Sequence, residues 1–104
     1  MYVNEEEKRI MRGLFIAINE YPKEIYTLEY SNGTIIKATV FTCYESNNGL
    51  DLDEEGYEEF NECAMRVIEI VTSGKGNVFQ LGELIGINYL EYPLSIKTSS
   101  GEII

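Results

Sequence analysis

Two segments rich in β-branched and aromatic residues, 25–30 and 34–44, constrain the fold of this chain more than any other feature. A Ser-Asn-Gly sequence separates them, which is typical of the turn of a β-hairpin. A three-residue loop with Gly33 left-handed would place Leu28 opposite Ile36, whereas a two-residue loop would mix polar and apolar residues on both faces. We therefore predict the three-residue loop, with one apolar face formed by Tyr26, Leu28, Tyr30, Ile36, Ala38 and Val40.

Two other segments have apolar residues at helical spacing. The first covers residues 4–20, where Asn4 and Glu7 resemble a capping box. We expect the second helix to begin at Asp51, with Glu54 completing another capping box, and to end before the Ser-Gly-Lys-Gly-Asn sequence at 73–77. Its apolar face would consist of Tyr57, Phe60, Ala64, Val67, Ile68 and Val71.

Short strand-like segments complete the chain, at 78–81, 84–90, 94–98 and 102–104. The predicted order is α-β-β-α-β-β(-β). Two helices that are each apolar on one face need a sheet to cover, so the predicted fold is an α+β two-layer sandwich with a mostly antiparallel sheet. The length of 104 residues predicts a single domain, 1–104.

The composition argues against catalysis. The chain has no histidine, which is the commonest general base and a leading ligand of zinc and copper. Its two cysteines, Cys43 and Cys63, are too few for a disulfide scaffold and fit a reducing compartment. No segment approaches the ~18 consecutive apolar residues of a membrane span, and the first residues are acidic. We predict a cytoplasmic, non-enzymatic protein without catalytic residues, metal site or cofactor.

The acidic residues are concentrated in one part of the chain. Residues 45–69 contain nine acids and one base, Arg66, which gives −8 of the formal net charge of −10. Like charges four residues apart destabilise a helix, and a face built only for solubility would more naturally alternate in sign. We therefore predict that this segment binds a basic partner through Asp51, Asp53, Glu54, Glu55, Glu58, Glu59, Glu62 and Glu69.

In size and charge the chain resembles the small acidic inhibitors that phages and mobile elements direct against restriction or CRISPR nucleases. On a helix, the glutamates would approach the charge density of one DNA strand, with about one phosphate per 3.4 Å. The resemblance implies an inhibitor that mimics nucleic acid and binds the basic surface of a protein, such as a nucleic-acid-binding enzyme. We predict no direct nucleic-acid binding and no membrane contact, and the oligomeric state is not predicted.

Three alternatives stay open. Residues 51–62 resemble an EF-hand calcium loop, with acids at loop positions one, three, five and twelve and a glycine at six. Glu55 and Glu58 depart from that pattern, and no helix is expected before Asp51. The protein could instead be a structural subunit whose acidic face only keeps it soluble, or a small enzyme that uses carboxylates. Three tyrosines are candidate exposed anchors for a partner: Tyr44, Tyr89 and Tyr92.

Overall fold

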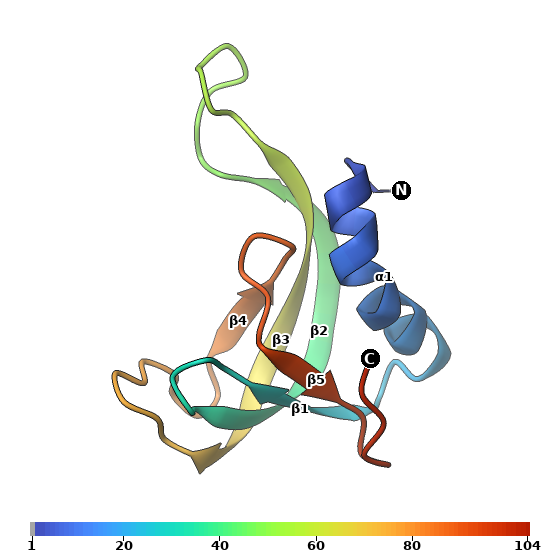
Figure 1. Cartoon of the computed structure of the whole chain (residues 1–104), viewed down its shortest axis with the longest axis vertical. Helices are drawn as coiled ribbons and strands as arrows, with labels where there is room; N and C mark the ends of the chain where they lie inside the picture. The colour runs from blue at the N-terminus through green and yellow to red at the C-terminus, as the bar shows by residue number, and fades with distance from the viewer. Residues whose placement is uncertain (1) are drawn as a thin grey trace.

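The computed structural model describes residues 2–104 and contains, within them, one helix and one five-stranded antiparallel sheet (Figure 1). The strand order is β4-β3-β2-β1-β5. The α+β class is confirmed. The prediction of a second helix, and of a layer of two helices, is wrong. The elements are α1 (Glu5–Glu20), β1 (Ile25–Glu29), β2 (Ile35–Asn47), β3 (Glu59–Thr72), β4 (Leu84–Ile87) and β5 (Ser95–Lys97).

The hydrophobic core lies between α1 and one face of the sheet. Met11, Leu14 and Ala17 bury one side of the helix at its 3.6-residue spacing. Full burial of a side chain such as leucine or methionine contributes roughly 1.5–3 kcal/mol, so this face holds the helix on the sheet. The sheet side of the core consists of Tyr26, Leu28, Ile36, Ala38, Cys63, Met65, Val67, Ile87 and Ile96.

The first helix and the first hairpin form as the sequence predicts. The Asn4 side chain accepts a hydrogen bond from the Glu7 amide at 2.8 Å and caps the helix. In the hairpin Leu28 pairs with Ile36, and Gly33 has φ +89°, which only glycine adopts at low cost. The three-residue loop and the apolar face inferred from it are therefore confirmed.

The segment expected as the second helix is instead the long strand β3, preceded by a loop at 48–58. Five of the six residues from Val67 to Thr72 are β-branched, and such side chains lose rotamer freedom in a helix but fit a pleated sheet. Met65 and Val67 are buried while Arg66 and Ile68 are exposed, which is the period of two of a strand. The helical spacing in this region was coincidental.

The remaining strands are shorter than expected. Residues 78–81 form no strand, and the predicted strands 84–90 and 94–98 contract to β4 and β5. The last segment contributes one isolated bridge between Lys97 and Ile103. No helix among residues 2–104 has the length and apolar composition needed to cross a membrane.

Gly74, in the loop after β3, contacts the turn of the first hairpin too closely to admit a side chain. An added Cβ would lie 2.3 Å from the Asn32 carbonyl oxygen and 2.5 Å from the Thr34 amide nitrogen. We expect Gly74→Ala to destabilise the fold by about 1–3 kcal/mol in urea unfolding, because backbone must move. Lys75→Ala, at the exposed neighbour, is the control and should stay within about 0.5 kcal/mol. Equal stability of the two variants would contradict this packing.

Candidate functional site

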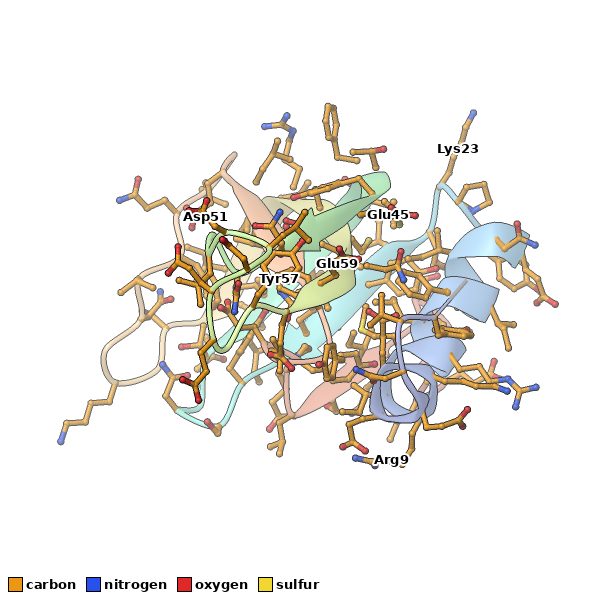
Figure 2. All side chains as sticks on the ribbon, turned by 90° about the horizontal axis from the view of Figure 1, so that it is seen from above. Arg9, Lys23, Glu45, Asp51, Tyr57 and Glu59 are labelled. Atoms are coloured by element: carbon orange, nitrogen blue, oxygen red, sulfur yellow. The ribbon has the colours of Figure 1, made fainter. Side chains whose placement is uncertain are left out.

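The β2–β3 hairpin extends past the rest of the sheet (Figure 1). Its projecting end carries most of the net negative charge of the sequence. We call residues 45–62 the acidic arm. Figure 2 looks down on it, with Asp51 and Tyr57 on the loop and Lys23 and Arg9 at the margins of the view. The arm has no lysine or arginine and eight acids: Glu45, Asp51, Asp53, Glu54, Glu55, Glu58, Glu59 and Glu62.

The loop of the arm, 48–58, is held by its own hydrogen bonds. The Asn48 side-chain amide donates to the Gly56 carbonyl at 2.7 Å, and Gly49 and Gly56 have φ of +85° and +87°. Glu54 Oε1 accepts from the Asp51 amide at 3.1 Å. Asp51 and Glu54 therefore make the backbone-to-carboxylate contact expected of a capping box. This contact closes a single turn, whereas a helix was predicted.

Tyrosine hydroxyls fix several of the carboxylates on the arm. Because a carboxylate that accepts a hydroxyl favours the neutral phenol, the bonds to Glu62 and Glu59 raise the pKa of Tyr44 and of Tyr57, respectively. These acids are thereby oriented before any partner arrives. The three hydrogen bonds join Tyr57 to Glu59 at 2.9 Å, Tyr89 to Glu58 at 3.0 Å, and Tyr44 to Glu62.

Glu62 has a structural role in addition to its charge. It lies over Gly86 of β4, where an added Cβ would be 2.5 Å from Glu62 Oε1. The Asn88 side-chain amide donates to the same oxygen at 2.9 Å, and the Tyr44 hydroxyl donates to the other. This carboxylate therefore links the arm to β4 and the loop that follows it.

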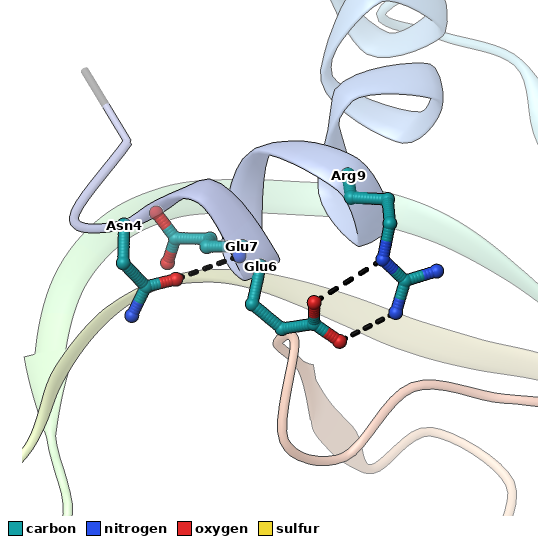
Figure 3. Close-up of polar contacts among 4 residues, drawn as sticks. All are labelled: Asn4, Glu6, Glu7 and Arg9. Carbon is teal, nitrogen blue, oxygen red and sulfur yellow. Dashed lines mark hydrogen bonds and ion pairs between the residues drawn. The ribbon is translucent and has the colours of Figure 1, made fainter.

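A second carboxylate, Glu7 of α1, links the arm to the helix. It is fully buried and accepts hydrogen bonds from the Val3 amide at 2.9 Å, the Asn61 amide at 2.7 Å and the Asn61 side chain at 2.8 Å. Figure 3 shows its amide at the Asn4 cap, beside the ion pair of Glu6 with Arg9. The sequence identified Glu7 only as a capping residue, because nothing in the local pattern shows a contact 54 positions away.

Seven of the eight predicted partner-binding residues lie on the arm, and Glu69 does not. The tip carries Asp51, Asp53, Glu54 and Glu55, all exposed, while Glu58, Glu59 and Glu62 are at or near the start of β3. Glu69 lies opposite Lys37 near the other end of β3 and lines a different groove with Lys37 and Lys97.

The EF-hand alternative is not supported by the geometry. Residues 51–62 run from a hairpin loop into β3, where an EF-hand has a helix on each side. Glu62, which would be the bidentate ligand, is held by Tyr44 and Asn88. Among residues 2–104 the acids and cysteines form no group of three placed to hold a metal ion.

A groove of about 430 Å³ lies between the N-terminal part of the chain and the base of the arm. We call it the helix-side groove. The sequence did not predict it, because its walls come from segments far apart in the chain and no local pattern marks their meeting. Its lining residues are Tyr2, Phe15, Cys43, Tyr44, Glu45 and Asn61.

The site is thus a projecting, strongly acidic hairpin on an α+β body. Comparison with family models gives a match to "Cognate immunity protein YxxD" over residues 10–104. The chain therefore belongs to this family of cognate immunity proteins. Membership indicates an inhibitor that acts by binding, with a toxin protein as its partner. No curated protein and no solved structure matches the chain.

Replacing Glu7 tests the link between α1 and the arm. Glu7→Gln puts an amide donor where the carboxylate now receives three donors, so at least one part-buried donor would face another donor at this site. We expect a loss of roughly 2–3 kcal/mol in the free energy of unfolding. Glu5→Gln, at an exposed position in the same helical turn, is the matched control and should change stability by less than about 0.5 kcal/mol. If both variants unfold at the same urea concentration, Glu7 has no such role.

The charge of the arm predicts a salt dependence of stability. The single ion pair among the described residues is Glu6–Arg9, against a net charge of −10, so repulsion within the arm is largely uncompensated. Raising the ionic strength from about 0.01 M to 0.1 M shortens the Debye length from about 30 Å to 10 Å. The melting temperature should rise by about 5 °C. A variant with Asp51→Asn, Asp53→Asn and Glu55→Gln should show much less of this rise, because it has less charge to screen. An unchanged wild-type melting temperature would contradict this.

Proposed function

We propose that the protein neutralises its cognate toxin by binding it through the acidic arm. Family membership supports a toxin as the partner. The charge of the arm supports it as the binding surface, since residues 45–62 contain eight acids and no base. A surface of this charge fits a basic patch on the toxin. It would attract that patch at long range, raise the association rate and disfavour acidic surfaces.

The order within the arm supports this assignment. Binding costs less conformational entropy when the contacting segment already has its bound shape. The loop hydrogen bonds and the tyrosine–carboxylate bonds supply this order before contact. Leu52, at 77% exposure, adds an apolar side chain among the tip acids, where it can be buried against the toxin.

A narrower form of the proposal concerns what the basic patch does. If the toxin acts on nucleic acid, the arm would occupy the site that binds phosphates, as the resemblance to nucleic-acid-mimicking inhibitors suggests. The carboxylates lie on a hairpin and its loop, so they would replace phosphates by charge and not by regular spacing. This form predicts that a DNA or RNA oligonucleotide competes with the immunity protein for the toxin. If the protein inhibits the toxin but an oligonucleotide does not compete with it, nucleic-acid mimicry is contradicted and only binding of a basic patch by the arm is left.

The test reverses three tip acids whose side chains make no hydrogen bond among residues 2–104. Asp51→Lys, Asp53→Lys and Glu55→Lys in one variant should weaken toxin binding at least 100-fold, because cations would then face a basic patch. Binding is measured by calorimetry at about 0.1 M salt, after circular dichroism has shown that the variant is folded.

The matched control makes the same change in net charge away from the arm. Glu20→Lys, Glu69→Lys and Glu102→Lys are exposed positions, and this variant should bind within about threefold of wild type. Similar losses in the two variants would mean that net charge and not the arm drives binding. A folded arm variant with wild-type affinity would leave the arm as a feature for solubility.

A further inference from the structure

We infer that the helix-side groove receives a long basic side chain of the toxin, an arginine or a lysine. This inference rests on the proposed function and adds the partner chemistry at a second part of the interface. The groove lies at the base of the acidic arm, and Glu45 belongs to both. A toxin that covers the arm from this side would therefore reach the groove.

The walls of the groove provide apolar contact for the stem of such a side chain. The rings of Tyr2 and Phe15 lie 6.2 Å apart between centroids and are tilted by 35°. Both line the groove, and both are packed against the hydrophobic core, which fixes them in place. Aromatic rings attract the methylene stem of arginine or lysine, and their faces attract its cation.

The charge of the groove selects a cation over an anion. Glu45 is exposed at its wall, and an adjoining groove of about 270 Å³ shares Tyr2, Glu45 and Asn61 and adds Glu59. No lysine or arginine of the described chain lines either groove. An entering guanidinium or ammonium would thus meet carboxylates without a competing cation from this chain. Arginine is also enriched among the residues that contribute most to protein interfaces.

Cys43 provides a reporter inside the groove. It is exposed, whereas its cross-strand partner Cys63 is fully buried. A hydrogen bond from the Cys63 thiol lowers the pKa of Cys43, and the same bond together with burial raises the pKa of Cys63. Cys43 is therefore the thiol that iodoacetamide can reach, and the buried Cys63 should stay unmodified.

The experiment measures iodoacetamide labelling of Cys43 by mass spectrometry, for the free protein and for its complex with the purified cognate toxin. We expect labelling to be at least tenfold slower in the complex. Labelling at the same rate in both states would overturn the inference, because an occupied groove would cover this thiol.

Variants of Glu45 test the charge of the occupant. Glu45→Gln should weaken toxin binding about tenfold and Glu45→Lys at least 100-fold, while Glu20→Gln and Glu20→Lys, at an exposed position on α1, serve as matched controls without effect. Phe15→Leu keeps an apolar side chain but removes the ring, and should weaken binding several-fold. Melting curves verify that each variant is folded.

The outcomes separate this inference from the proposed function. Wild-type affinity of Glu45→Lys, together with loss of binding in the Asp51, Asp53 and Glu55 reversal, would overturn the groove inference and leave the arm as the toxin-binding surface. Protection of Cys43 without an effect of Glu45→Lys would overturn the basic occupant, because the groove would then be covered by a neutral part of the toxin. Wild-type affinity in both sets of variants would overturn both proposals.

Discussion

The pairing of β2 with β3 is the constraint on which the rest of the structure depends. These strands have 13 and 14 residues, whereas β1, β4 and β5 have 5, 4 and 3. The helix and the short strands cover only part of the long ladder, and the remainder projects as the acidic arm (Figure 1). Backbone hydrogen bonds between the two strands hold the base of the arm, and the hydrogen bonds of the loop 48–58 hold its tip, outside the main hydrophobic core. The side chains of the arm therefore do not need to be apolar, and acidic residues are tolerated there.

Some acids in and beside the arm have a structural role, and others are exposed without side-chain hydrogen bonds to the described residues. Glu7 and Glu62 are held by several donors and connect the arm to α1 on one side and to β4 on the other. Removing either would take an acceptor from one or more part-buried donors, so these two carboxylates belong to the fold. Asp51, Asp53 and Glu55 are exposed at the tip and make no such bonds among residues 2–104, so their charge is available to a partner. A count of acids in the sequence does not distinguish the two groups.

The sequence predicted what depends on local contacts. The Asn4 cap and the register of the first hairpin follow from neighbouring residues, and both are confirmed. The apolar spacing of the segment 59–72 fits a helical wheel. The segment nevertheless forms a strand, because it is rich in β-branched residues and pairs with β2. The candidate site was predicted from its charge and stays a prediction, and the helix on which it was placed is a hairpin in the structure. Glu69 is seven positions after Glu62, a rise of about 10 Å along a helix but about 23 Å along a strand. Glu69 therefore lies outside the arm.

Hydrogen exchange of the free and toxin-bound protein tests the central claim most directly, because it locates the interface without any substitution. If the acidic arm binds the toxin, amides in the loop 48–58 and at the adjoining ends of β2 and β3 should exchange more slowly in the complex, while the rest of the sheet changes little. An alternative surface exists on the same two strands around Phe41 and Ile68, which are 60% and 43% exposed. Slower exchange at Phe41 and Ile68, with the loop 48–58 unchanged, would contradict the account.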